Sequence, residues 1–194
     1  MANFKIAFEL TSQAEGGYSN SQYDKGGETW RGISRVYHPN WQGWQIIDQY
    51  KSQYKNFVDY LWKDKQLNQL VFDFYKQNFW DVMNLDNCNS QLIANELYDT
   101  GVNMGDKIAA QFLQVILNRL NKKQTLWPNI AEDGKIGNQT INTLNLALTK
   151  HAQMEIVILR ALNCLQGARY ISITSEDSNN EMNLLGWLLH RVVI

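Results

Sequence analysis

The chain has 194 residues, of which 44% are hydrophobic and 12% are aromatic, and its formal net charge is −1. This length is sufficient to bury a substantial core in one domain or two packed subdomains, and the apolar content excludes a disordered chain. Lysine and arginine form no cluster, so the chain lacks the basic surface that is typical of nucleic-acid-binding proteins.

The N-terminal sequence MANFKIAFELTSQAEGG contains a short apolar stretch that Glu9 interrupts. The continuous apolar segment of a signal peptide is missing. No run in the sequence approaches the ~18 apolar residues of a membrane helix. We therefore expect synthesis in the cytoplasm without a signal peptide, and no integral membrane segment.

Most of the chain carries apolar residues at helical spacing. The first helix is expected over residues 4–14, with Asn3 as its cap and Gly16 as its stop. Residues 18–32 break this pattern, because they are rich in Gly, Ser, Asn and Asp, and predict a short hairpin or ordered loop. Further helices are expected over residues 44–61 and 67–75, as two helices within 90–120 that join at residues 101–105 (with Asp106 as N-cap of the second), from 139 onward, and over 150–165 and 181–192. The fold class is therefore mainly α, with one small β-hairpin or loop excursion after the first helix.

Two carboxylates and a hydroxyl surround this excursion. Glu15 stands directly before two glycines, Asp24 follows nine residues later, and Thr29 follows five residues after that. A hairpin that folds back across the helix end brings all three into one cleft, where an acid and a water-activating carboxylate can hydrolyse a glycosidic bond. Taken singly, they also fit a solvated glutamate, a turn aspartate and a strand threonine.

Glu15 has the better position for the acid. The C-terminal end of a helix disfavours a carboxylate by ~0.3–1 kcal/mol, which raises its pKa slightly. Aromatic neighbours such as Tyr18 and Trp30 are expected to raise that pKa further by desolvation. The glycines leave room beside the acid for a bulky sugar.

The string EGGYSNSQYDKGGETWRGI resembles the N-terminal signature of the family-108 glycoside hydrolases, which are lysozyme-like bacterial and phage muramidases. Its pattern is E-G-G-Y, then Asn, then D-x-G-G-x-T-x-x-G-I. The resemblance continues through FYKQNFWD (74–81), LYDTGVNMG (97–105), AAQFLQ (109–114), DGKIGNQT (133–140) and GWLLHR (186–191). The later segments resemble the predicted peptidoglycan-binding region that accompanies this catalytic module. We therefore expect a catalytic region over residues 1–90 and a helical peptidoglycan-binding region over 91–194, packed together as one compact unit.

The resemblance implies a phage-lysozyme type of fold, with Glu15 as the essential acid. By analogy with the phage lysozymes, Asp24 and Thr29 position the attacking water, and the reaction proceeds with inversion. The spacing between Asp24 and Thr29 is one residue shorter than expected for those enzymes, so Thr29 is the less closely matched of the two. Glu28 is a rival carboxylate at a variable position of the pattern, and we expect it to face solvent.

Other residues are candidates for substrate binding. Tyr18 and Trp30 lie in the signature, and Trp30 is expected to stack on a sugar ring, whereas Trp44 is expected in the core. Asn103 and Asp99 either line the other wall of the cleft or bond locally.

No metal or cofactor is expected. The histidines are scattered without the spacing of a zinc site. Cys88 and Cys164 are too few for a disulfide framework and lack metal-site spacing, so we expect isolated buried thiols rather than one bridge.

The predicted function is an N-acetylmuramidase that cleaves the β-1,4 bond between N-acetylmuramic acid and N-acetylglucosamine in peptidoglycan. One alternative is a cysteine amidase or peptidase, which requires Cys88 or Cys164 beside a histidine. The other is a non-catalytic peptidoglycan-binding or secretion accessory protein. The expected partners are peptidoglycan glycan strands, with no nucleic acid, and a holin or secretion machinery that releases the protein to the periplasm and cell wall.

Overall fold

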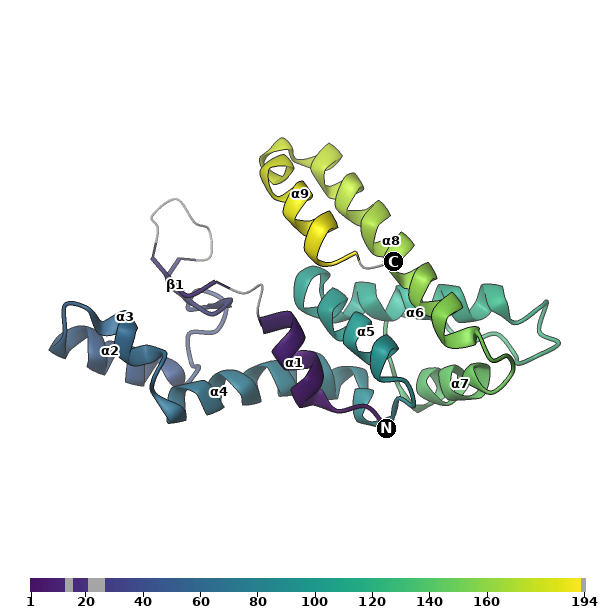
Figure 1. Cartoon of the computed structure of the whole chain (residues 1–194), viewed down its shortest axis with the longest axis horizontal. Helices are drawn as coiled ribbons and strands as arrows, with labels where there is room; N and C mark the ends of the chain where they lie inside the picture. The colour runs from purple at the N-terminus through teal and green to yellow at the C-terminus, as the bar shows by residue number, and fades with distance from the viewer. Residues whose placement is uncertain (13–15, 21–26, 193–194) are drawn as a thin grey trace. The chain divides into compact units, whose positions relative to one another are not determined.

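The computed structural model describes residues 1–12, 16–20 and 27–192 (Figure 1). The backbone divides into two compact units, one of Thr11–Gln77 and one of Met1–Leu10 with Asn78–Ile194. Helices dominate both units, and the first helix is followed by a small antiparallel sheet of three strands. The predicted fold class is therefore confirmed. The expected division into a catalytic and a peptidoglycan-binding region stays a prediction.

The sheet of the unit Thr11–Gln77 consists of β1 (Tyr18–Ser19), β2 (Thr29–Trp30) and β3 (Ile33–Ser34), in that order. Thr29 pairs with Ser19 on one side and with Ser34 on the other. The turn between β2 and β3 has positive φ at both central residues, 46° at Arg31 and 80° at Gly32. Two successive positive φ angles are typical of the tight two-residue turn whose twist matches that of the two strands it connects.

Three helices complete this unit, namely α2 (Gly43–Gln53), α3 (Phe57–Leu61) and α4 (Lys65–Tyr75). The single helix expected over residues 44–61 is wrong, because Tyr54 has an extended backbone that ends α2. The apolar residues at helical spacing are nevertheless buried as expected, since α2 buries Ile47 and α3 buries Leu61. The break also lets Tyr54 and Tyr60 stack, with ring centroids 4.3 Å apart.

The second unit contains the beginning of α1 (Phe4–Ser12), where Asn3 is confirmed as a cap, its Oδ1 accepting from the Lys5 N–H at 2.9 Å. An aromatic cluster buries Phe4 against Trp80 and Tyr98, with centroids 5.5 Å away in both cases. Four short segments join the longer helices: η1 (Lys76–Trp80, π-helical), η2 (Asp81–Met83), η3 (Leu85–Asn87) and η4 (Ser178–Asn180).

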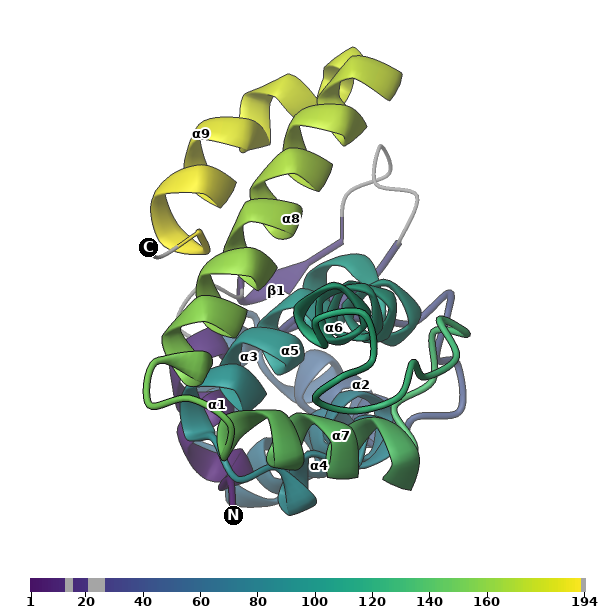
Figure 2. The ribbon, with the colours of Figure 1, turned by 90° about the vertical axis from the view of Figure 1, so that its right-hand side faces the viewer.

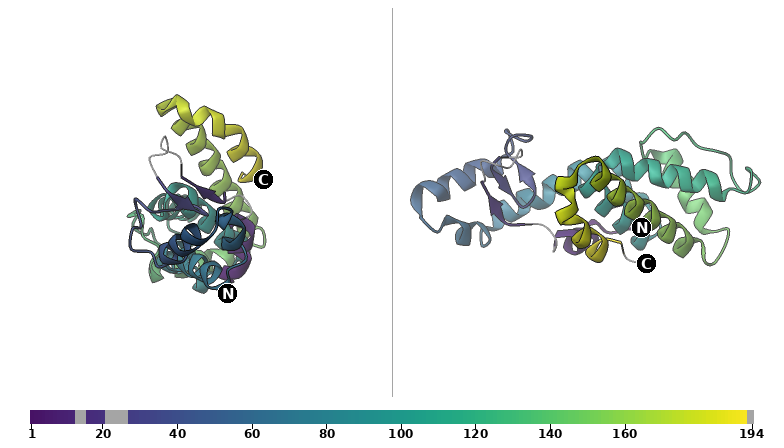
Figure 3. Two further views of the ribbon diagram at one scale, coloured as in Figure 1. Left: turned by 90° about the vertical axis from the view of Figure 1, so that its left-hand side faces the viewer. Right: turned by 90° about the horizontal axis from the view of Figure 1, so that it is seen from above.

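The longer helices of this unit are α5 (Gln91–Met104), α6 (Asp106–Leu120), α7 (Asn138–Leu148), α8 (Met154–Glu176) and α9 (Glu181–His190). The cap of α6 is Gly105 rather than Asp106, because Gly105 has φ 94° and Asp106 is already helical. Figures 2 and 3 show α9 turning back along the second half of α8. Tyr170 of α8 and Trp187 of α9 stack there at 4.9 Å.

Both cysteines are free thiols, as expected. Cys88 is buried, but Cys164 is exposed on α8, so the expectation of two buried thiols is wrong for Cys164. Over the described ranges, no helix has the length and apolarity needed to cross a bilayer. Within the same ranges, no group of three histidine, cysteine or acidic side chains is arranged to hold a metal ion.

Candidate active site

In the sequence, the predicted catalytic residues belong to the segment that leads into and forms the three-stranded sheet. Glu15 and Asp24 lie outside the described residues, so the structure places only their neighbours and Thr29. Thr29 sits on the central strand, and its Oγ1 donates to the carbonyl of Gly27 at 3.2 Å. The roles of the three residues in catalysis stay predictions.

The two glycines that follow Glu15 meet different surroundings. A Cβ on Gly17 would lie 3.3 Å from the indole of Trp62, closer than most side chains pack. At Gly16, by contrast, a Cβ would meet no described atom within 4 Å. The carbonyl of Gly17 also accepts from the N–H of Arg31 at 3.1 Å, which ties this segment to the hairpin turn. Contact with Trp62 therefore explains the second glycine, but no described contact explains the first.

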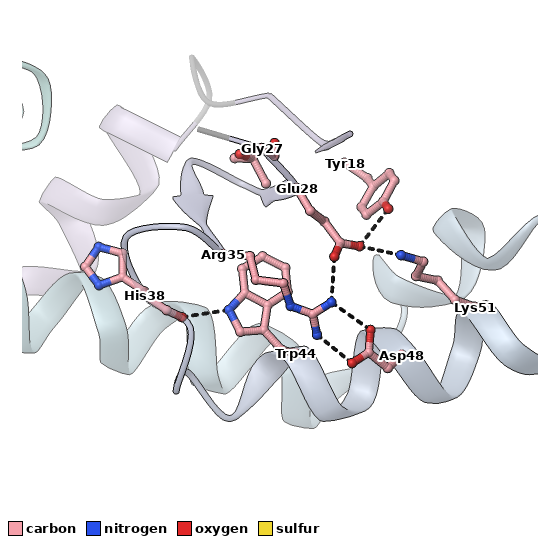
Figure 4. A network of polar contacts seen from close by, with 9 residues as sticks. Tyr18, Gly27, Glu28, Arg35, His38, Trp44, Asp48 and Lys51 are labelled. Carbon is pink, nitrogen blue, oxygen red and sulfur yellow. Dashed lines mark hydrogen bonds and ion pairs between the residues drawn. The ribbon is translucent and has the colours of Figure 1, made fainter. Parts of the chain in front are cut away.

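Glu28, beside Thr29, is the centre of a polar network (Figure 4). Its Oε1 accepts from the hydroxyl of Tyr18 and from Nζ of Lys51, both at 2.7 Å. Its Oε2 accepts from Arg35 at 2.6 Å, and Arg35 also pairs with Asp48 on α2. The side chain of Glu28 is only 10% exposed, so the expectation that it faces solvent is wrong. The residues next to Glu28 in the sequence give no sign of these partners, because Tyr18 lies on β1, Arg35 follows β3 and Lys51 lies on α2.

This network fixes the charge state of Glu28. Burial alone raises the pKa of Glu28, but the hydrogen bonds from Lys51 and Tyr18 and the charges of Lys51 and Arg35 outweigh burial and hold the pKa below its usual value. Glu28 is therefore a carboxylate at neutral pH and has no proton to give to a leaving group. Its position suits a group that holds β2 against α2, not a general acid.

Tyr18 is committed to the same network. Its ring packs edge-on against Phe57 with centroids 4.9 Å apart, and its hydroxyl donates to Glu28. Burial, and then the contact with Glu28, raise the pKa of the Tyr18 hydroxyl. The proposed role of Tyr18 in substrate binding stays a prediction.

The tryptophans differ sharply in their access to solvent. Trp30 is fully buried, and Trp44 is 3% exposed, which confirms that Trp44 belongs to the core. The buried indole of Trp30 presents no face to a ligand, so its position does not support stacking on a sugar. Trp62, at the C-terminal end of α3, is 47% exposed. Sequence reasoning missed Trp62, because its spacing does not separate it from the core tryptophans.

Asn103 lies on α5 in the other unit. Its Nδ2 donates to the carbonyl of Asp99 at 2.7 Å and to Oδ2 of Asp99 at 3.2 Å. Asp99 in turn pairs with Arg191 at 2.8 Å. These are the local bonds that the sequence left open as an alternative, and the role of Asn103 in binding stays a prediction.

A second buried glutamate occupies α5. Glu96 is 9% exposed, and within the described part of the chain its Oε1 has no hydrogen-bond partner. Burial and the charge of Asp99 raise the pKa of Glu96 to about 8, and the hydrogen bonds from Asn163 and Thr100 offset only part of that rise. Glu96 is therefore mostly protonated at neutral pH.

The turn at residues 131–140 is held by one neutral side chain. Gln114 of α6 is 1% exposed, and its Nε2 donates to Oδ1 of Asp133 and to the carbonyl of Lys135 at 2.9 and 3.0 Å. Its Oε1 accepts from the N–H of Gly134 at 2.9 Å. Gly134 has φ 74°, which glycine adopts without strain. The segment DGKIGNQT thus owes its shape to α6.

The fold and the arrangement around the sheet define a mainly helical protein of the lysozyme-like class. The family model for glycosyl hydrolase 108 matches residues 8–105, and the model for a predicted peptidoglycan domain matches residues 108–192. The chain belongs to the glycosyl hydrolase 108 family, which confirms the resemblance seen in the sequence.

Several solved structures resemble the chain, and one of them does so over nearly its whole length. It is described as the structure of Brucella abortus SagA, with a TM-score of 0.54, 20% sequence identity, and coverage of 97% of this chain and 95% of that chain. At this identity the similarity shows the fold alone. No curated protein matches the chain.

Proposed function

We propose that the protein is an N-acetylmuramidase that hydrolyses the β-1,4 bond between N-acetylmuramic acid and N-acetylglucosamine in peptidoglycan. The observation that carries this proposal is the glycosyl hydrolase 108 match over residues 8–105, followed directly by the peptidoglycan-domain match. The first match includes all three predicted catalytic positions, and the second supplies a region suited to hold the polymer.

In the proposed mechanism Glu15 protonates the leaving oxygen of the glycosidic bond. Asp24 and Thr29 position the attacking water on the opposite face of the sugar, so the reaction inverts the anomeric centre. Glu28 does not serve as the acid, because its donors Lys51, Tyr18 and Arg35 keep it ionised and occupy both of its oxygens. Its contribution is to anchor the strand of Thr29 to α2 through Arg35 and Lys51.

The alternative is a peptidoglycan-binding or secretion accessory protein that keeps the fold without cleavage. The peptidoglycan-domain match over residues 108–192 favours it equally, since binding needs no acid. In either case we propose that the protein acts at the cell wall, in the periplasm, after release through a holin or a secretion machinery.

The decisive variant is Glu15→Gln, which keeps the size of the side chain and removes the proton. Purified peptidoglycan is incubated with wild type, Glu15→Gln and the control Glu9→Gln, and turbidity and soluble products are followed by mass spectrometry. We expect new reducing-end muramic acid from wild type and Glu9→Gln, and at least a 100-fold lower rate from Glu15→Gln, in line with the loss of general acid catalysis. A folded Glu15→Gln with wild-type activity rejects the assigned acid. Binding without cleavage by all three proteins instead supports the accessory function.

A further inference from the structure

Trp62 is a large apolar side chain left in solvent in a unit that buries two other tryptophans, Trp30 and Trp44. Its exposed fraction of 47% contrasts with 0% for Trp30 and 3% for Trp44 in the same unit. Single exposed apolar side chains are common in proteins and need a second observation before they indicate a site. That second observation is the way in which the indole is held.

Three groups fix the Trp62 ring in place. The ring of Trp30 meets it nearly edge-to-face, with centroids 5.0 Å apart and the planes inclined at 61°. The guanidinium carbon of Arg31 lies 5.4 Å from its centroid, within the range of a cation–π contact. Gly17 approaches so closely that a Cβ would lie 3.3 Å from the indole. The indole is therefore oriented before any ligand arrives, which lowers the entropic cost of binding.

Arg31 is itself held in place, by its position in the hairpin turn and by two residues of α4. Its backbone has φ 46°, its carbonyl accepts from the hydroxyl of Tyr75 at 2.7 Å, and its guanidinium donates to Asn68 at 3.2 Å. A non-glycine residue in the left-handed region is uncommon and is kept where the surroundings determine it. Here the conformation places the guanidinium beside Trp62.

We propose that Trp62 is a sugar-stacking platform that binds a ring of a β-1,4-linked N-acetylhexosamine strand. The pyranose ring of such a sugar presents a face of C–H groups, and an indole face carries the negative part of the aromatic quadrupole. Gly17, which packs on the platform, follows Glu15 by two residues in the chain. The sugar class rests on the proposed function, whereas the platform itself rests on the exposure and fixation of Trp62.

The test measures binding of the tetramer of β-1,4-linked N-acetylglucosamine by calorimetry, in a Glu15→Gln background that prevents turnover. We expect Trp62→Ala to weaken binding about tenfold or more, which corresponds to about 1.4 kcal/mol. Trp62→Phe keeps a ring face and should stay within about threefold of the parent. The matched control is Tyr54→Ala, since Tyr54 is 40% exposed and also contacts aromatic rings. It should bind as the parent does.

A second readout covers the case in which Trp62→Ala fails to fold. The indole N–H signal of Trp62, assigned by its absence in Trp62→Phe, should shift during titration with the tetramer. Unchanged affinity in a folded Trp62→Ala, or an indole signal that does not move, overturns the proposal. So does a parent protein that does not bind the tetramer.

These results are separable from the muramidase assay. If wild type releases muramic acid from peptidoglycan but Trp62→Ala binds normally, only the platform is rejected. If the tetramer binds through Trp62 but wild type cleaves nothing, only the catalytic function is rejected.

Discussion

Two glutamates, one in each unit, both have little exposed surface but are kept in opposite charge states, and Glu96 is the more deeply buried of the two. Glu28 is surrounded by donors, with Tyr18, Arg35 and Lys51 all on its two oxygens. Glu96 lies in a helical interior with Asp99 nearby, and its donors among the described residues are the neutral side chains of Asn163 and Thr100. The pKa of Glu28 is lowered and that of Glu96 is raised to about 8.

The difference shows that burial alone does not decide the charge of a carboxyl group. A buried carboxylate is stable where cations and hydrogen-bond donors replace water, and otherwise the group keeps its proton. In the hairpin region this produces an ionic anchor between β2 and α2. In the helical region it produces a neutral polar contact between α5 and α8.

The largest effect on the free energy of unfolding is expected at Glu96. Its pKa is about 8 in the folded protein, against an ordinary value of 4.5. Between these values the folded state binds the proton that the unfolded state has released, so the free energy of unfolding falls as pH rises. The stabilisation that protonated Glu96 gives to the fold is complete below about pH 4.5. It is lost as pH rises to about 8, and the free energy of unfolding then falls with a limiting slope of about 1.4 kcal/mol per pH unit.

Glu96→Gln replaces the acid by a neutral amide of the same shape and removes this dependence. We expect the variant to match wild type near pH 5 and to exceed it by about 3 kcal/mol near pH 8, measured by urea unfolding. The titratable groups coupled to Glu96 are Asp99 and Tyr170, and Arg191 acts on both of these groups. A difference between variant and wild type that stays constant from pH 5 to pH 8 would show that Glu96 is ionised in the fold.

The second largest effect on the free energy of unfolding is expected at Glu28, and it depends on pH in the opposite direction. Glu28→Gln should lower the free energy of unfolding by about 2 kcal/mol at pH 7, because three donors lose their charged acceptor. Arg35 and Lys51 are about one-third exposed, so water compensates part of the loss. The contribution is present above the unfolded pKa of Glu28, and wild type loses it as pH falls through the lowered folded pKa.

Asp48→Asn is the matched control for Glu28→Gln, since it removes the other carboxylate bound to Arg35. The side chain of Asp48 is 53% exposed, so its removal should cost less than about 1 kcal/mol. Equal losses in the two variants would mean that the exposed pair, not buried Glu28, holds β2 to α2.

The sequence predicted those features that depend on neighbours along the chain. Helical spacing located most helices, and the Gly-rich segment after residue 17 located the sheet. Contacts between distant residues were not predictable from spacing. Glu28 meets Arg35 seven residues away and Lys51 twenty-three residues away, and packing alone decides that Trp30 is covered while Trp62 is not. The catalytic roles of Glu15 and Asp24 came from the family pattern and stay predictions.

The smallest effect is expected at an ion pair that lies on the surface. Arg119 is 3.6 Å from Glu132, with side-chain exposures of 69% and 36%. Arg119→Gln should change the free energy of unfolding by no more than about 0.5 kcal/mol, because water solvates both charges and salt screens them. Urea unfolding at low and high salt measures this change.

Beside this pair, Asn118 is 8% exposed, and its amide exchanges two hydrogen bonds with Ile130, at 2.8 and 2.9 Å, and donates to Glu132 at 3.0 Å. Asn118→Ala leaves the buried N–H of Ile130 without its acceptor and should cost about 2 kcal/mol. If Arg119→Gln costs as much as Asn118→Ala, the charge rather than the buried amide anchors this segment. We expect the loss of stability to be larger for Asn118→Ala than for Arg119→Gln. As at Glu28, polar groups stabilise this protein where they replace water, and they contribute little where water still solvates them.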